Sequence, residues 1–198
     1  MSRPTAAIAR IDPLPIALAA LALAVRLPYL TERSLWYDEA SSWQTASFPL
    51  PELFHSVRRN VHMPLYYLLL KGWMGLFGDS VAALRGFSIT FGVLTVLLVD
   101  RMAREVYRSS IASEESAVDA EARDRRARLF GLSTAVLVAC SPFQVLASIE
   151  ARMYSLGTAL TALSGWFVLL ILRRDGGGRL WWSFGATCLA LAYVHHYG

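Results

Sequence analysis

Two adjacent carboxylates, Asp38 and Glu39, are the first residues in the chain whose types suggest chemistry. Neighbouring side chains project differently, so the two are poorly placed to share one proton, but either could accept a proton from a substrate hydroxyl. Trp36, Tyr37 and Trp43 surround the pair. Aromatic rings beside carboxylates are common in sugar sites, and interfacial aromatic belts of membrane proteins explain them equally well. The pair indicates a general base, with two solvated loop charges as the alternative.

Glu150 and Arg152 form a second charged group, in a short connection between two apolar segments. Ionisable residues at membrane depth are costly and therefore suggest function. The planar fork of Arg152 suits a phosphate or pyrophosphate, whereas a local ion pair that ends the preceding helix is the alternative. Arg26 and Arg85 lie near the ends of other apolar segments, where we expect their guanidinium groups to extend toward water. We also take Arg85 as a candidate substrate-binding residue.

The histidines are weaker candidates. His62 lies just before Pro64, where the restricted backbone could fix the direction of its imidazole toward a site. His195 and His196 are adjacent rather than four residues apart, so they cannot easily ligate one metal ion from one helix face. Ordinary interfacial packing is an equal alternative for each. A divalent metal cofactor stays open, but no spacing requires one, and we assign no metal ligand.

The composition indicates a membrane protein. The chain has 198 residues, of which 55% are hydrophobic and 17% charged, whereas a soluble domain carries about 25% charged residues. These figures argue against an ordinary soluble domain and against disorder. The two cysteines, Cys140 and Cys188, lie in apolar runs and are interpreted as small buried residues. Lys71 is the only lysine among 19 basic residues, and cytoplasmic loops explain this basicity better than nucleic-acid binding does.

Five apolar segments could cross a membrane, for which a helix needs about 20 apolar residues. We expect these spans over residues 14–30, 81–99, 129–147, 153–172 and 180–198. They leave an external loop over 31–80 and a cytoplasmic loop over 100–128. Residues 64–78 are apolar but too short to span comfortably, so we expect a short juxtamembrane or re-entrant helix inside the external loop.

Basic residues set the orientation. With five spans, the N-terminus, the 100–128 loop and the 173–179 turn share one side, which holds twelve arginines against six basic residues on the other. The positive-inside rule makes the basic side cytoplasmic. The sequence thus predicts an all-α, multi-pass membrane helix bundle with a cytoplasmic N-terminus. Its acids and histidines gather on the non-cytoplasmic side.

The order of these motifs resembles the N-terminal part of the polytopic GT-C glycosyltransferases. Within this group the chain most resembles the family-39, dolichyl-phosphate-mannose-type mannosyltransferases and their bacterial relatives. Family motifs often read His-Pro-Pro-Leu where this chain has His62-Met63-Pro64-Leu65. The matching segments, in chain order, are Leu35-Trp36-Tyr37-Asp38-Glu39-Ala40, His62-Met63-Pro64-Leu65-Tyr66-Tyr67-Leu68, Ser141-Pro142-Phe143, Glu150-Ala151-Arg152-Met153-Tyr154 and His195-His196-Tyr197-Gly198.

The resemblance implies an inverting glycosyltransferase that moves a sugar from a polyprenyl-phosphate donor to an acceptor hydroxyl outside the cytoplasm. The acceptor would be a protein, a glycan or a lipid, and no nucleic acid is implied. Asp38 would be the general base, Glu39 would support acceptor binding or orient its partner, and Arg152 would contact the donor phosphate. The other candidate substrate-binding residues are His62, Arg85, Glu150, Tyr154, His195 and His196.

Members of the resembled family run to several hundred residues with more spans. We therefore expect this chain to be the N-terminal part of one transmembrane domain, inactive alone, in a bacterial plasma membrane. The alternative function is a transporter or flippase of lipid-linked sugars. Transporters more often carry charges deep within spans, or broken helices in repeated halves. Here the charges gather at one interface, which favours a catalytic cavity.

Overall fold

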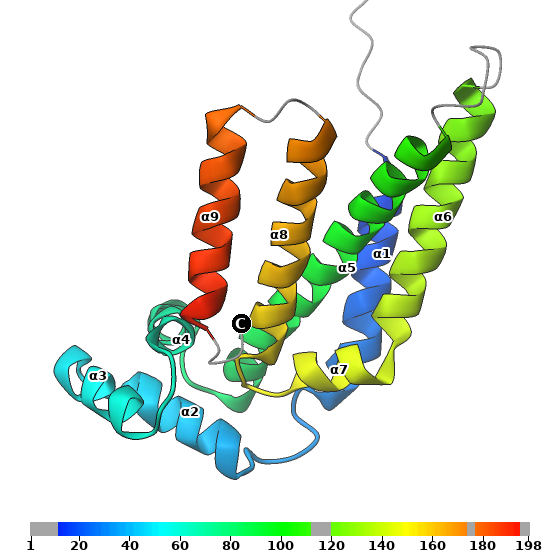
Figure 1. Cartoon of the computed structure of the whole chain (residues 1–198). Helices are drawn as coiled ribbons and strands as arrows, with labels where there is room; N and C mark the ends of the chain where they lie inside the picture. The colour runs from blue at the N-terminus through cyan, green and yellow to red at the C-terminus, as the bar shows by residue number, and fades with distance from the viewer. Residues whose placement is uncertain (1–11, 112–119, 174–176, 195–198) are drawn as a thin grey trace, which may run out of the picture.

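The computed structural model describes residues 12–111, 120–173 and 177–194, and these residues form helices and connecting segments without a strand. The long helices lie side by side as a bundle (Figure 1). α5 is central, because it packs against α1, α6, α7 and α8, while α9 packs on α8. The long helices are α1 (Pro13–Arg26, continued by the 3-10 turn η1, Leu27–Tyr29), α5 (Val81–Ile111), α6 (Ala120–Cys140), α8 (Tyr154–Arg173) and α9 (Gly178–Ala192).

Four shorter helices gather at one end of the bundle (Figure 1). They are α2 (Tyr37–Ser47), α3 (Leu50–Arg59), α4 (Pro64–Phe77) and α7 (Pro142–Ile149). Proline occupies one of the first two positions of α3, α4 and α7, where its missing N–H costs nothing. Gly78 follows the last residue of α4, and its positive φ of 80° suits glycine. The short helix expected over residues 64–78 is therefore present as α4.

Two helices are long and apolar enough to cross a membrane, over Val81–Ser110 and Tyr154–Arg173. α6 and α7 add a third span if they are counted together, although a bend of 58° separates them. The helical segment Pro13–Tyr29 is apolar but shorter. The described residues thus contain two or three candidate spans, and the expected five stay a prediction.

Two helices extend beyond the expected segments. α5 continues to Ile111 instead of ending near residue 99, and α6 begins at Ala120 instead of 129. Much of the segment expected as a loop over 100–128 is therefore helical. The expected span over 129–147 is interrupted at Ser141, where Pro142 begins a new helix.

Ion pairs explain why the charged end of α5 stays helical. Asp100 pairs with Arg104 one turn later at 2.9 Å, and Glu105 pairs with Arg108 at 3.7 Å. Pairs at these spacings stabilise a helix. Arg108 also pairs with Asp124, so that α5 is tied to α6 at this end.

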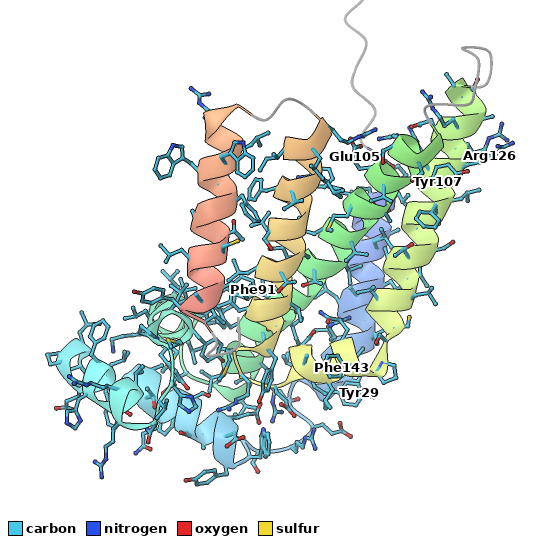
Figure 2. All side chains as sticks on the ribbon, viewed as in Figure 1. Tyr29, Phe91, Glu105, Tyr107, Arg126 and Phe143 are labelled. Atoms are coloured by element: carbon cyan, nitrogen blue, oxygen red, sulfur yellow. The ribbon has the colours of Figure 1, made fainter. Side chains whose placement is uncertain are left out.

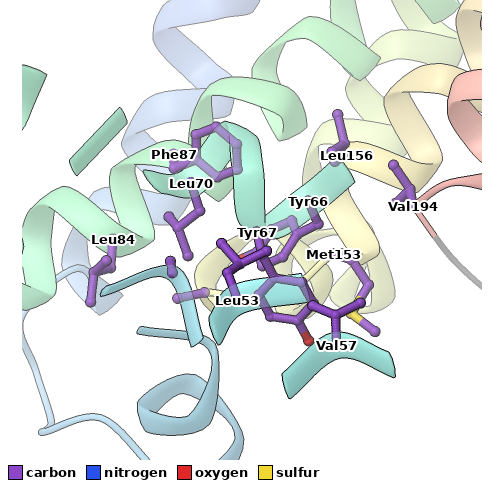
Figure 3. Close-up of a cluster of buried hydrophobic side chains, with 12 residues drawn as sticks. Leu53, Val57, Tyr66, Tyr67, Leu70, Leu84, Phe87, Met153, Leu156 and Val194 are labelled. Carbon is purple, nitrogen blue, oxygen red and sulfur yellow. The ribbon is translucent and has the colours of Figure 1, made fainter. Parts of the chain in front are cut away.

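Aromatic and aliphatic side chains from α3, α4, α5 and α8 form one buried cluster (Figure 3). Tyr66 of α4 is 1% exposed, and its ring lies 5.8 Å from that of Phe87 in α5. The amide of Leu65 donates to the carbonyl of Tyr193 at 3.1 Å. These contacts fix α4 between α5 and the ends of α8 and α9.

Small side chains let the remaining helices approach closely. Ala22 of α1, Val96 of α5 and Ala135 of α6 are fully buried in a second cluster. The cysteines do not join either cluster, because Cys140 and Cys188 are both exposed. Their expected burial is therefore wrong, since each lies on an outward-facing part of its helix.

Candidate functional site

Glu39 lies in the first turn of α2 and joins three parts of the chain. Its carboxylate accepts hydrogen bonds from Arg85 Nε at 2.9 Å and Arg85 Nη2 at 2.8 Å. It also accepts one from the backbone amide of Ala151 at 2.9 Å and one from that of Trp36 at 3.3 Å. One carboxylate therefore holds α2 against α5 and against the connection between α7 and α8.

The surroundings of Glu39 keep it ionised. Burial alone would raise its pKa, but the hydrogen bonds from Arg85, Ala151 and Trp36 outweigh burial and lower the pKa below its ordinary value. Glu39 is 1% exposed and accepts four hydrogen bonds. These bonds use both carboxylate oxygens and hold the first turn of α2 in place.

Arg85 is the cationic partner and does not extend toward water. It is 2% exposed, and besides Glu39 it donates to the backbone carbonyls that follow α1. These carbonyls belong to Tyr29, Leu30, Arg33 and Ser34, at 3.0 to 3.3 Å. The expected snorkelling of Arg85 is wrong, because this loop supplies the acceptors that water was expected to provide. Contact with a substrate would require these bonds to open.

Asp38 and Arg152 meet across the bundle end although 114 residues separate them. Arg152 Nη2 lies 3.9 Å from Asp38 Oδ2, and Arg152 Nη1 donates to the backbone carbonyl of Asp38 at 3.5 Å. The Asp38 side chain is 39% exposed, whereas Arg152 is largely buried. The structure thus brings together an accessible carboxylate and a guanidinium, as a base beside a phosphate-binding group requires.

Tyr154 contacts the Arg152 side chain, and Tyr67 acts on its charge electrostatically. The Arg152 guanidinium carbon lies 5.8 Å from the centre of the Tyr154 ring. Burial alone would lower the pKa of Arg152, but its hydrogen bond to Tyr154, with Tyr67 and Asp38 nearby, raises the pKa. Arg152 therefore stays cationic, and its buried Nε has no hydrogen-bond partner in the described residues.

Glu150 follows α7 and has the opposite tendency. Burial raises its pKa, the negative charges of Glu39 and Asp38 add to this, and Arg33 and Arg152 oppose it. It also lines an apolar groove of about 580 Å³ between α7, α8 and the end of α9. Tyr154 lines the same groove and contacts Arg152, which links the groove to the Asp38 pair.

Outer apolar side chains of α7 form part of the groove. Phe143 is 77% exposed and Leu146 is 50% exposed. Figure 2 shows Phe143 and Tyr29 at the end of the molecule that holds the site, and Arg126 at the opposite end. The Phe143 side of the groove therefore lies at the same end of the bundle as the charged pair.

His62 lies next to Tyr67, near the Asp38–Arg152 pair. Its ring lies 5.9 Å from that of Tyr67, whose pKa is raised mainly by burial and also responds to Arg152 and Asp38. His195 and His196 lie outside the described residues. Sequence reasoning missed Tyr67 as a site residue, although its place in the motif after His62 could have suggested it.

The described residues contain no group of three His, Cys, Asp or Glu side chains that could hold a metal ion. The acids of the site are instead held by arginine and backbone amides. Glu39 pairs with Arg85, and Asp38 faces Arg152. A half-buried carboxylate beside a guanidinium is an arrangement that can accept a proton and bind an anion.

A family model covers most of the chain. The model described as "Protein O-mannosyl-transferase TMEM260 N-terminal domain" matches residues 63–197. A search of curated proteins and a search of solved structures find no match. The matched segment includes Arg85 and Arg152 but begins after Asp38 and Glu39, so the structural contacts connect the first acidic pair to the family region. This chain belongs to the protein O-mannosyl-transferase TMEM260 N-terminal domain family.

Proposed function

We propose that this protein is an inverting glycosyltransferase that moves a sugar, of the mannosyl type, from a polyprenyl-phosphate donor to an acceptor hydroxyl. The family match supports glycosyl transfer in general. The single observation that carries the proposal is the approach of Asp38 to Arg152, at 3.9 Å. It pairs a candidate base with a candidate phosphate ligand.

In the proposed reaction, Asp38 accepts the proton of the acceptor hydroxyl. The hydroxyl oxygen attacks the anomeric carbon as the bond from that carbon to the phosphate oxygen breaks, so the configuration inverts. The phosphate leaves with the bonding electron pair, and the guanidinium of Arg152 stabilises its charge. The positive charge that Arg152 keeps at this place supports this role, because a planar guanidinium suits a phosphate.

Glu150 fits the same reaction as a carboxyl with a raised pKa. In its protonated form Glu150 would not repel an anionic donor, whereas in its carboxylate form it would. Burial is the main cause of the raised pKa of Glu150. This residue precedes Arg152 by two positions in the chain. We therefore assign Glu150 and Tyr154 to donor binding, and Glu39 with Arg85 to positioning.

The apolar groove supports a lipid-linked donor. Its volume is about 580 Å³, and its lining is mainly apolar apart from Glu150, Tyr154 and threonines of α8. A hydrocarbon chain in this groove would lie next to the cation that binds its phosphate. A free sugar nucleotide has no hydrocarbon to bury there.

The membrane arrangement belongs to the same proposal. We propose that α1 and α9 add to the candidate spans, giving five, with the N-terminus in the cytoplasm. The side-by-side packing of these helices supports this count (Figure 1). The arginine-rich ends of α5 and α6 lie at the end of the bundle opposite the site, which supports a non-cytoplasmic site (Figure 2).

The test is a transfer assay with radiolabelled polyprenyl-phosphate mannose in membranes that contain the full-length gene product. We expect Asp38→Asn to lower turnover by at least about 100-fold, since general-base catalysis contributes about 10²–10⁴-fold. Glu52→Gln is the matched control, because Glu52 is an exposed carboxylate on α3. Activity of Asp38→Asn within a few-fold of wild type, or a product of retained configuration, would contradict the proposal.

A second candidate function is transport of a lipid-linked sugar. The observation that favours it is the 58° break between α6 and α7, because transporters often build their sites from broken helices. Proteoliposomes with a labelled lipid-linked sugar distinguish the two functions. Movement of the intact lipid across the bilayer without sugar transfer would support transport instead of catalysis.

A further inference from the structure

Arg26 is the last residue of α1, and its side chain is completely buried. Its Nη1 donates to the carbonyl of Ala22 at 2.9 Å and to the carbonyl of Ala139 in α6 at 3.2 Å. Within the described ranges no carboxylate pairs with it, and its Nε and Nη2 lack hydrogen-bond partners. A buried cation without a counter-charge is costly, so the expected snorkelling of Arg26 is wrong and its burial needs a reason.

The carbonyl of Ala139 lies at the break between α6 and α7. In an unbroken helix it would accept a hydrogen bond from the amide of Phe143. Pro142 instead begins a new helix in another direction. The Arg26 guanidinium donates to the Ala139 carbonyl in place of that amide. Arg26 also lies at the carboxyl-terminal ends of α1 and α6, where the helix dipoles favour a positive charge.

Close packing holds α7 against this point. Gly92 of α5 has no room for a side chain, because a Cβ there would lie 2.4 Å from Ser148 Oγ and 3.1 Å from Arg26 Nε. The Ser148 hydroxyl donates to the carbonyl of Gln144 at 2.5 Å within α7. Four helices, α1, α5, α6 and α7, therefore meet at the Arg26 side chain.

α7 leads directly into the candidate site. It ends at Ile149, and two residues later the amide of Ala151 donates to Glu39 at 2.9 Å. The direction of α7 therefore decides whether this amide reaches the carboxylate. Glu39 in turn holds the first turn of α2, which carries Asp38.

We propose that Arg26 is a positioning residue, which caps the carbonyl end of α6 and so fixes the direction of α7. Its effect reaches the site through the amide of Ala151, which holds Glu39 and with it α2. The consequence for turnover rests on the proposed function. The effect on α7 is structural and does not need turnover.

The test measures the distance between α2 and α7 in the purified protein by pulsed electron spin resonance. Spin labels are attached at Gln44→Cys and Phe143→Cys, both at exposed positions, after Cys140 and Cys188 are replaced by alanine. We expect one narrow distance with Arg26 present. Arg26→Met should give a longer and broader distribution, and Arg26→Lys, which keeps a donor, should restore the narrow one.

The same distance is then followed as the pH is lowered. Loss of the Ala151 bond raises the pKa of Glu39 toward its ordinary value, so α2 should separate at a higher pH in Arg26→Met than in wild type. General loosening of the bundle would broaden the distance at every pH without moving this midpoint. The acid side of the transfer activity should move in the same direction in the unlabelled variants.

Arg101→Met is the matched control, because Arg101 is an exposed arginine of α5. It should leave the distance and its pH midpoint unchanged. If Arg26→Met does not fold, Pro142→Ala carries the test. It restores a backbone N–H that can continue α6 through the break, and we expect the same lengthening.

The inference is overturned if Arg26→Met keeps the wild-type distance and pH midpoint. If Arg26→Met does not fold, the same result in Pro142→Ala overturns it. An effect of Arg101→Met equal to that of Arg26→Met would also overturn it. If no variant and no wild-type sample transfers sugar while the distances change as expected, the proposed function fails and the role of Arg26 in positioning α7 stands.

Discussion

Glu39 and Arg85 form a two-point ion pair in which both side chains are buried, at 1% and 2% exposure. Removing one partner of such a pair leaves an uncompensated buried charge, whereas removing both can be nearly neutral. The pair lies between α2 and the candidate spanning helix α5, and its two residues are 46 apart in the sequence. It therefore links α2, which carries Asp38, to the bundle.

We expect Glu39→Leu to destabilise the protein by about 3–5 kcal/mol, the usual cost of leaving one buried charge unpaired. Arg85→Leu should be similarly costly, because the Glu39 carboxylate then stays buried with only amide donors. The double variant should unfold at a higher temperature than either single variant. Thermal unfolding in detergent measures this, and additive losses in the double variant would contradict coupling between the two side chains.

The low pKa of Glu39 predicts an acid-dependent stability. A carboxyl whose pKa is lowered by folding stabilises the native state above its unfolded pKa, and this stabilisation is lost as the pH falls through the folded value. At neutral pH we expect this group to have no effect on the pH dependence of the unfolding temperature. Once the pH falls below 4.5, the ordinary pKa of a glutamate, the unfolding temperature should decrease. Glu39→Gln should remove this part of the pH dependence. An equal acid loss in wild type and Glu39→Gln would show that other groups cause it.

Sequence reasoning found the helical class and the starts of two long helices, each to within one residue. The starts expected at residues 81 and 153 agree with α5 and α8, because apolar length and flanking charges set these positions locally. The break at Ser141 was missed, since a run of apolar residues on both sides of Pro142 looks continuous. Whether proline interrupts a membrane helix depends on partners such as Arg26, which come from elsewhere in the fold.

Within the site, the motifs identified the residues but not the separate role of each residue. Asp38 and Glu39 are neighbours with the same chemistry, and only the fold makes one half-exposed and the other buried. The side chain of Arg85 was expected to extend toward water. The backbone carbonyls that accept its hydrogen bonds are 51 to 56 residues away in the sequence, so the residues around Arg85 gave no sign of them. Pairings at such separations follow from tertiary packing and have no local signal.

The raised pKa of Glu150 predicts a pH effect on donor binding. Below its pKa the side chain is neutral, and above it the new negative charge repels the donor phosphate. The KM for the polyprenyl-phosphate donor should therefore rise as the pH passes upward through the pKa of Glu150. Glu150→Gln should keep a low KM over this range. Parallel KM profiles for wild type and Glu150→Gln would place Glu150 outside the donor site.

Arg152 is expected to act mainly on the leaving phosphate. Removing one donor that stabilises developing negative charge costs about 10²–10³-fold in turnover, so Arg152→Met should lower kcat by that factor. Arg152→Lys should recover part of the loss, because it keeps the charge but not the planar fork. Arg58→Met is the matched control, since Arg58 is exposed on α3. Steady-state kinetics with saturating acceptor measures kcat and the KM for the donor. A large rise in KM with unchanged kcat would assign Arg152 to ground-state binding of the donor, because an interaction made equally in the ground and transition states leaves kcat unaffected.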